Sequence, residues 1–186
     1  MSATLSMLRA ALLDPPSNAD LQAPVRTPTR AWPWLCDSLG HVNNVRYLDV
    51  AQDGRIWWLA RMGLLRGVLR GRLSFLVAGM SGLYRRAIPR MEPFTVETRL
   101  VAFDQRFVCY LQTFTLSHAP QGQVAARFLC RGQLRDAQGA LEPAACMRRF
   151  GLELPALPEP PPDVTAWLAA QDAALDEVRA QDRQRG

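Results

Sequence analysis

The sequence predicts an α+β fold in which an antiparallel β-sheet wraps around one long central α-helix. The first observation behind this prediction is a helical pattern over residues 45–62 that is apolar over much of its circumference. The second is a series of strand-like segments that follows it, with alternating apolar and polar residues. The third is size, because 186 residues that are 48% hydrophobic can bury one substantial core.

The first predicted element is a short strand over residues 28–35. Pro33 places it near an edge or a bend, because proline cannot donate a hydrogen bond to a sheet. A turn with Asp37 follows, and Gly40 breaks regular structure there. Cys36 adjoins Asp37, but neighbouring side chains of an extended segment point to opposite faces. We therefore expect Cys36 to be a small buried apolar residue rather than a nucleophile.

The central helix has a predicted start and a predicted end. Asn43 or Asn44 is suited to cap its N-terminus, and Gly63 stands where a glycine commonly ends a helix. A carboxylate held beside free N–H groups at the start of a helix is suited to attack on a polarised carbonyl. Asp37 is therefore the first candidate for chemistry.

The strands come after the helix. Residues 64–72 are a mixed apolar and basic segment that fits a helical extension or a loop. Within the next predicted strand, Gly79 and Gly82 indicate a bend or a bulge where backbones approach closely. A helix that is apolar over so wide an arc is usually covered by other structure, so we expect the sheet to wrap it. The predicted strands cover residues 74–87, 94–103, 106–116 and 124–135.

The chain divides into three predicted parts: an N-terminal extension (1–24), a main domain (25–154), and a Pro-rich linker with a C-terminal helix (155–186). In the extension, a short amphipathic helix is expected to pack on the domain. It lacks the basic start and cleavage pattern of a signal peptide, so the cytoplasm is the default location. No apolar run approaches the ~20 residues that span a bilayer.

Two of these predicted helices lie outside the main domain. The one in the N-terminal extension covers the apolar stretch at residues 5–13. The one in the tail covers residues 164–183 and can be capped by Asp163 or Thr165. The tail helix either docks back on its own domain or binds a partner.

The charged and metal-binding residue types exclude several classes of site. All 22 basic residues are arginines, and the net charge is +5. Guanidinium groups suit phosphate oxygens, but the arginines are spread along the chain and no nucleic-acid motif is present. Four separated cysteines and two histidines exclude a zinc site of ordinary spacing and argue against a disulfide framework. We expect no metal and no redox cofactor.

Four motifs together resemble a known family. They are Asp37-Ser-Leu-Gly-His-Val-Asn-Asn-Val-Arg-Tyr47, Gly82-Leu-Tyr-Arg-Arg86, Val96-Glu-Thr98, and Asp104 ahead of the strand at 106–116. This pattern resembles the hotdog-fold acyl-CoA thioesterases of the 4-hydroxybenzoyl-CoA thioesterase type, over about residues 27–135. Within that superfamily it is similar to the thioesterase-like branch with the THEM6-like proteins. The resemblance implies the hotdog fold, an acyl-CoA substrate, and a homodimer or dimer of dimers.

The resemblance also implies catalytic roles. Asp37 would attack the thioester carbonyl or activate water, and the backbone N–H of Asn44 would polarise the thioester oxygen. From the residues alone, Asp37 could instead only shape its turn. One rival function is a non-catalytic acyl-CoA-binding or lipid-binding module. A second is a hotdog dehydratase, which is disfavoured because the spacing from Asp37 to His41 differs from that of those enzymes.

Six further residues are candidates for substrate binding. His41 would lie near the substrate or be structural, Asn43 would contact the substrate or cap the helix, and Tyr47 would pack with its hydroxyl toward the sheet or a dimer partner. The arginines would meet the phosphates of coenzyme A, although a solvated strand end fits two of them equally well. Family enzymes carry several basic residues at the hairpin that corresponds to Asp104-Gln105-Arg106, and in this chain only one residue of that hairpin is basic. These arginines are Arg85 and Arg86 at a strand end and Arg106 at the hairpin.

Overall fold

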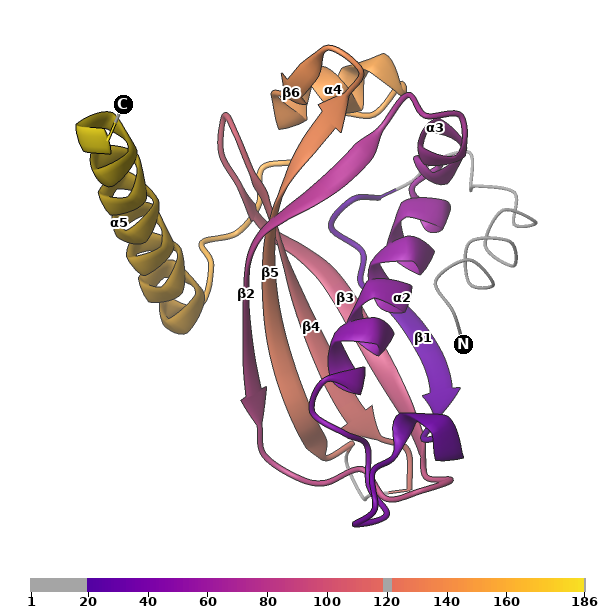
Figure 1. Ribbon diagram of the computed structural model, residues 1–186. Helices are drawn as coiled ribbons and strands as arrows, with labels where there is room; N and C mark the ends of the chain where they lie inside the picture. Colours follow the sequence, from indigo (N-terminus) through magenta and orange to yellow (C-terminus); the bar gives the residue numbers. More distant parts are fainter. Residues whose placement is uncertain (1–19, 119–121, 186) are drawn as a thin grey trace. The chain divides into compact units, whose positions relative to one another are not determined.

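The computed structural model describes residues 20–118 and 122–185, so the helix predicted at residues 5–13 lies outside the described residues. A six-stranded antiparallel sheet curls around the long helix α2 (Arg46–Arg61), which is the predicted architecture (Figure 1). The other elements, in chain order, are β1 (Val25–Arg30), the 3-10 turn η1 (Pro33–Leu35), α3 (Leu65–Leu69), β2 (Ser74–Tyr84), β3 (Pro93–Phe103), β4 (Val108–Leu116), β5 (Val124–Asp136), β6 (Gly139–Leu141), α4 (Pro143–Arg149) and α5 (Pro162–Arg185).

The first strand lies earlier in the chain than predicted. The prediction was residues 28–35, but β1 ends at Arg30 and Pro33 opens η1. Proline suits the first position of a helical turn because its fixed φ is already helical and its missing N–H would have no partner there. β1 forms one edge of the sheet, which runs in the order β1-β3-β4-β5-β2, with β6 paired to β5.

The predicted end of α2 is confirmed, and its predicted cap is wrong. Gly63 has a φ of 72°, and the N–H groups of Gly63 and Leu64 donate to the carbonyls of Ala60 and Leu59. This is the hydrogen-bond pattern of a glycine-ended helix. At the start, the cap position is Val45 and no side chain caps the helix. Asn43 forms a local turn instead, because its Oδ1 accepts the Val45 N–H.

β2 has the predicted irregularity. Its register with β5 shifts between Val77 and Gly79, and a Cβ at Gly82 would lie only 2.5 Å from the Phe128 ring. The strand ends at Tyr84 rather than at residue 87, because the N–H groups of Arg85 and Arg86 both bond to one carbonyl of β5. The other three predicted strands match β3, β4 and β5 to within two residues, and residues 64–72 contain the helical extension α3.

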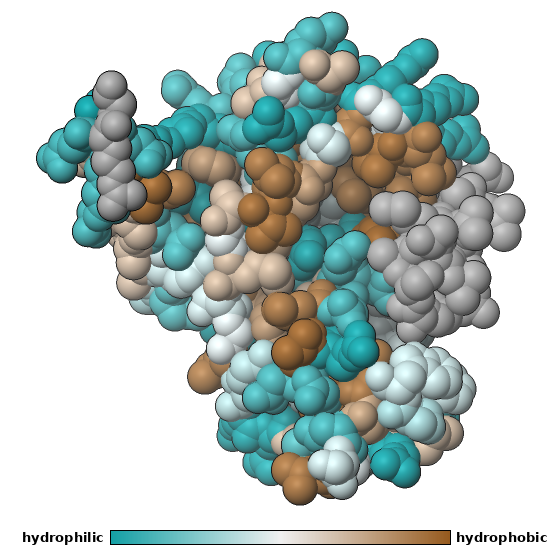
Figure 2. Space-filling view, in the orientation of Figure 1, coloured by the Kyte–Doolittle hydropathy of each residue, from teal (hydrophilic) through white to brown (hydrophobic). Residues whose placement is uncertain are grey.

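β2 is also the second edge of the sheet. Within the described residues it pairs only with β5, and it exposes the apolar side chains of Leu76, Val77, Leu83 and Tyr84. Figure 2 shows brown, hydrophobic surface in patches on the face where α2 and β2 lie in Figure 1. A long apolar edge strand is a surface that proteins usually cover by pairing.

The middle of α2 packs directly on the sheet. A Cβ at Gly54 would lie 2.8 Å from Thr98 Oγ1 and 2.9 Å from Gln112 Nε2, so only glycine allows this approach. Next to it, the Arg55 side chain is buried and its Nη1 donates to Gln112 Oε1 at 2.7 Å. Toward the start of α2, Tyr47 and Val50 pack on phenylalanines of β3, β4 and β5 to form the main core.

The chain forms two compact units, divided between Pro155 and Ala156. The second unit contains α5, which begins at Pro162, so neither Asp163 nor Thr165 occupies the predicted cap position. The Thr165 hydroxyl donates back to the carbonyls of the preceding prolines instead. In the first unit, the short elements β6 and α4 were not predicted. Among the described residues, none of the helices has the length and apolar character to cross a membrane.

Candidate functional site

The Asp37 turn is held closed by its own backbone. The Asp37 N–H donates to the His41 carbonyl at 3.0 Å, and the Gly40 N–H donates to the Asp37 carbonyl at 3.1 Å. Gly40 adopts a φ of 78°, which favours glycine, and Cys36 and Val42 form a β-bridge on either side of the turn. The sequence therefore fixes the position of one carboxylate just before α2.

The two carboxylate oxygens of Asp37 have different surroundings. Oδ1 accepts the Leu39 N–H at 2.9 Å, which orients the side chain. Oδ2 lies 3.6 Å from Nδ1 of His41, which is too long for a hydrogen bond. Both side chains are partly exposed, at 25% for Asp37 and 34% for His41. Oδ2 is therefore available to a ligand or a water molecule.

The backbone N–H of Asn44 is available as a donor. The neighbouring amides are used: Asn43 donates to the Leu35 carbonyl, and Val45 and Arg46 donate to Oδ1 and the carbonyl of Asn43. Within residues 20–118 and 122–185, the Asn44 N–H donates to no acceptor, and Asn44 is exposed. It also lies at the positive end of the α2 dipole, which favours a developing negative charge.

Tyr84 connects this end of α2 to β2. Its hydroxyl donates to the Asn44 carbonyl at 3.1 Å, between residues 40 positions apart in the sequence. The sequence analysis did not single out Tyr84, although it belongs to the motif Gly82-Leu-Tyr-Arg-Arg86. Its position at the end of a predicted strand, next to two arginines, is the sequence feature that could have identified it.

Tyr47 is buried next to Tyr84. Its ring lies edge-on to Tyr84 at 5.2 Å and stacks on Phe128 at 5.9 Å. The side chain is 2% exposed, and its burial raises the pKa of the Tyr47 hydroxyl to about 12. The backbone of Ile88, in the loop between β2 and β3, acts on the same pKa in the opposite direction. The expectation that Tyr47 packs is confirmed, and contact with a substrate stays a prediction.

The candidate arginines lie at two opposite ends of the sheet. Arg85 and Arg86 follow β2, at the end where β3 starts and where the His41–Pro89 bridge joins the Asp37 turn. Arg106 lies in the β3–β4 hairpin, beyond the pair Phe103–Val108. Eleven residues of β3 separate the two ends, which is about 30 Å of extended chain. One protomer therefore does not bring Arg106 to its own Asp37.

The hairpin of Arg106 is well ordered by local contacts. Asp104 Oδ1 accepts the N–H groups of Arg106 and Phe107, and Asp104 Oδ2 pairs with the buried Arg131 at 2.8 Å. The Arg106 guanidinium lies 5.2 Å from the centre of the Phe107 ring and is exposed. It is therefore free to bind an anion from another molecule.

The contacts of Cys36 bear on its predicted role. Cys36 is partly buried against the core, with its thiol directed at the carbonyls of Ala31 and Trp32, so it packs as a small apolar residue. In the part of the chain that the structure describes, no group of three or more His, Cys, Asp or Glu side chains is arranged to hold a metal ion.

Comparison with known proteins gives a consistent result. The family model described as the Thioesterase-like superfamily matches residues 31–168. Protein THEM6 of Xenopus laevis is 29% identical over 153 residues, which cover 78% of this chain and 67% of that protein. Protein THEM6 of Drosophila melanogaster is 30% identical over 141 residues, covering 75% and 68%.

Solved structures with a similar fold include thioesterases. The probable thioesterase YbaW from Escherichia coli is 26% identical, with a TM-score of 0.56 over 63% of this chain and 88% of that chain. A mutant 4-hydroxybenzoyl CoA thioesterase complexed with 4-hydroxybenzoyl CoA is 15% identical, with a TM-score of 0.59 over 66% and 94%. The second likeness concerns the fold alone. Together they confirm the predicted hotdog fold.

Proposed function

The chain belongs to the thioesterase-like superfamily, and from this premise we propose that it is an acyl-CoA thioesterase, which hydrolyses a thioester to a free acid and coenzyme A. One observation carries the proposal. At one end of α2, the Asp37 Oδ2 has no hydrogen bond and the Asn44 N–H has no acceptor among the described residues. In hydrolysis of a thioester, a carboxylate can serve as the nucleophile or base and a backbone N–H as the oxyanion donor.

The proposed reaction places the thioester carbonyl oxygen on the Asn44 N–H. In one route, the Asp37 carboxylate attacks the carbonyl carbon, the coenzyme A thiolate leaves, and water hydrolyses the resulting anhydride. In the other, Asp37 takes a proton from a water molecule that attacks the carbonyl carbon, and the same thiolate leaves. In both routes negative charge develops on the oxygen at the start of α2, where the helix dipole stabilises it.

Three neighbouring residues have supporting roles in this proposal. Tyr84 holds Asn44 through its carbonyl, so it is a positioning residue for the oxyanion donor. His41 lies beside Asp37 and close enough to meet the leaving group or the substrate. The Asn43 side chain is occupied by the Val45 N–H, so its contribution is to shape the turn that presents Asn44.

The active unit in this proposal is a homodimer, about 42 kDa for two 20.8 kDa chains, or a dimer of dimers. The free β2 edge of each protomer would pair with that of its partner, antiparallel and around a two-fold axis. This pairing brings the Ser74 end of one β2 beside the Tyr84 end of the other. Val77 and Val108 both pair with Gly132, so the Arg106 hairpin lies at the Ser74 end. Arg106 of the partner subunit would therefore approach the Asp37 end.

The test is a screen of acyl-CoA thioesters of different chain lengths and aromatic character, with release of free coenzyme A as the readout. We expect turnover with at least one class of thioester. A folded protein that binds acyl-CoAs but hydrolyses none of them would contradict the proposal and would favour a binding module. A product of hydration or dehydration, rather than a free acid, would favour the dehydratase instead.

A further inference from the structure

Large apolar side chains are exposed around the Asp37 turn, and the proposed chemistry uses none of them. The most exposed are Leu39 at 78% and Val45 at 66%. Trp34 is exposed at 56%, Met91 at 43% and Trp32 at 37%. We call these five residues the end patch. Single exposed apolar residues are ordinary, but a group of them at one site marks an interaction surface.

The end patch is continuous because three chain segments are hydrogen-bonded to one another. The Met91 N–H donates to the Ala31 carbonyl at 2.7 Å, next to Trp32. The Arg90 N–H donates to the Gly40 carbonyl at 2.8 Å, next to Leu39. The rings of Trp32 and Trp34 stack on each other at 5.3 Å, with an interplanar angle of 7°. The segment around η1 with Trp32 and Trp34, the Asp37 turn and the loop before β3 therefore form one surface.

Hydrogen bonds hold one member of the end patch in a strained backbone conformation. Met91 has a φ of 66° and is the one non-glycine residue with a positive φ in the described chain. Its N–H and carbonyl are both fixed, the carbonyl by Arg30 Nη1 at 2.6 Å. Such a conformation persists where the surroundings over-determine it, and it is concentrated at functional sites.

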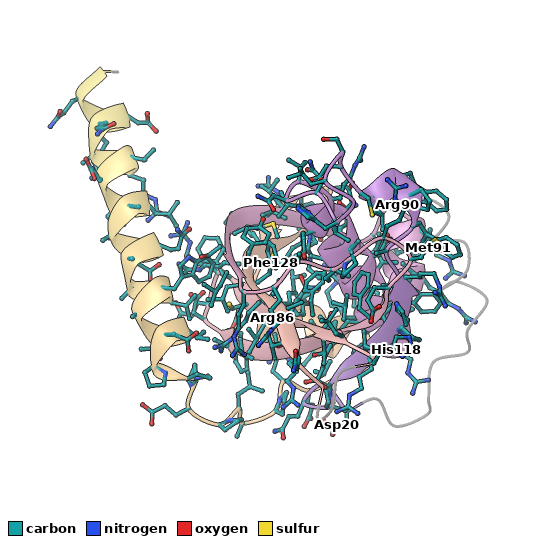
Figure 3. The ribbon with its side chains drawn as sticks, turned by 90° about the horizontal axis from the view of Figure 1, so that it is seen from below. Asp20, Arg86, Arg90, Met91, His118 and Phe128 are labelled. Atoms are coloured by element: carbon teal, nitrogen blue, oxygen red, sulfur yellow. The ribbon has the colours of Figure 1, made fainter. Side chains whose placement is uncertain are left out.

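Positive charge surrounds the end patch. Arg30 and Arg90 belong to the segments that form it, and Arg85 and Arg86 lie at the same end of the sheet. Figure 3 views this end from below and shows Arg90 beside Met91, with Arg86 nearer the middle. The acidic side chains in the same segments are Asp37 and Glu92, and both are partly buried. The exposed charged side chains here are those of Arg85, Arg86 and Arg90, so the net exposed charge of these segments is positive.

We propose that the end patch docks on a lipid surface with anionic headgroups. Tryptophan rings are favoured at the boundary between headgroups and acyl chains, and leucine and methionine side chains insert there. Arginine side chains reach outward from such a boundary to lipid phosphates. A second copy of the chain fits less well, because an isologous contact would place the arginines of one patch against those of the other.

Docking would bring the start of α2 to the membrane surface. Leu39 follows Asp37 by two residues and Val45 directly follows Asn44, so two members of the end patch are sequence neighbours of the proposed catalytic groups. An acyl-CoA that is dissolved in the bilayer by its acyl chain could then be taken up from the lipid side. This consequence rests on the proposed function, whereas docking itself does not.

The test is flotation of the full-length protein with vesicles of phosphatidylcholine alone and of phosphatidylcholine with phosphatidylglycerol. The wild type should float with the anionic vesicles at about 0.05 M salt and be released at about 0.5 M. Trp34→Ala with Leu39→Ser should lower the partition coefficient at least ~10-fold. Leu69→Ser with Phe103→Ala is the matched control, because both residues are exposed but lie outside the end patch. The control should float like the wild type.

Circular dichroism of each variant establishes that it is folded. Arg90→Gln separates the contribution of charge from that of apolar contact. We expect it to lose part of the vesicle binding, as the wild type does when the salt concentration is raised. Three results would overturn the proposal: a wild type that floats with neither vesicle, equal losses in the patch variant and its control, or a patch variant that loses self-association in sedimentation while vesicle binding is unchanged. The readout involves no turnover, so a protein inactive on every acyl-CoA still tests docking.

Discussion

The start and the middle of α2 differ in whether their polar groups are hydrogen-bonded within the protein. At the start, the Asn44 N–H and the Asp37 Oδ2 make no hydrogen bond within the described chain, and both residues are at least partly exposed. At the middle, Gly54 touches the sheet and the buried polar side chains are bonded to one another. The same helix therefore provides a reactive end and a rigid attachment to the sheet, about 15 Å apart at 1.5 Å per residue.

The buried network at the middle has an unusual feature. Arg55 is 7% exposed, and within the described residues no carboxylate pairs with it. Burial lowers the pKa of its guanidinium, and it donates a hydrogen bond to the neutral side chain of Gln112. Gln112 Nε2 in turn donates to the Ala51 carbonyl and to Thr98 Oγ1. A buried charge with so few partners is costly, so each remaining hydrogen bond should contribute strongly to stability.

The largest expected effect is at the attachment point. Gly54→Leu would place side-chain atoms within the space of Thr98 and Gln112, so we expect a loss of about 3 kcal/mol or more in the free energy of unfolding, or failure to fold. Urea denaturation measures it. Gln52→Leu, at an exposed position of the same helix, should change stability by less than about 0.5 kcal/mol. Equal stabilities of the two variants would show that α2 does not pack closely on the sheet.

The second effect is at the reactive end and concerns turnover alone. Asp37→Asn should lower kcat at least ~100-fold, because it removes the nucleophile or base, while stability and acyl-CoA binding are kept. Asp49→Asn is the control, as an exposed acid in the first turn of α2. Near-wild-type turnover in a folded Asp37→Asn protein would exclude the catalytic assignment.

The third effect measures the cost of the buried charge. Gln112→Leu removes the acceptor of Arg55, so we expect a loss of about 2 kcal/mol in the free energy of unfolding. Adding Arg55→Met should recover part of that loss, because the unpaired charge is then gone. A double-mutant cycle by urea denaturation measures the coupling. Strictly additive effects would mean that the two side chains do not depend on each other.

The same contrast explains what the sequence could predict of the fold. Gly63 was found as the end of α2 because a left-handed φ favours glycine. Gly79 marked the bulge in β2 because a glycine inside a strand is typical of a bulge. The start of α2 was predicted to within one residue, but its cap was misassigned because Asn43 satisfies the nearby donors in a local turn. A capping asparagine and a turn-forming asparagine have the same local sequence pattern.

The site was harder to predict than the fold because its contacts join distant parts of the chain. The Asp37 turn is local, so its motif identified it. The contact of Tyr84 with Asn44 depends on where β2 ends, and the separation of Arg106 from Asp37 depends on the course of the whole sheet. Arg106 and Arg85 were both predicted to bind the phosphates of coenzyme A, whereas the sheet places them at opposite ends.

The fourth effect tests whether Tyr84 positions the oxyanion donor. Tyr84→Phe removes the hydrogen bond to the Asn44 carbonyl, and a bond of about 1 kcal/mol corresponds to a fall of about fivefold in kcat. KM should stay unchanged, which a loss of substrate contact would not produce. Tyr47→Phe is the comparison, since Tyr47 is a buried neighbour of Tyr84 whose hydroxyl makes no bond to Asn44 in the described chain, and it should affect stability rather than kcat. An unchanged kcat in Tyr84→Phe would remove its positioning role.

The smallest effect distinguishes the two ends of the sheet. Arg106→Ala should raise KM for an acyl-CoA about threefold at low salt, because an exposed charge–phosphate contact is worth under about 1 kcal/mol and is screened by salt. Arg85→Ala with Arg86→Ala should act in the same direction. Neither change should affect an acyl-pantetheine thioester, which lacks the nucleotide phosphates. Since Arg106 lies about 30 Å from the Asp37 of its own chain, its effect requires a partner subunit. A KM effect of Arg106→Ala in a protein that sediments as a monomer would therefore contradict the proposed β2 pairing.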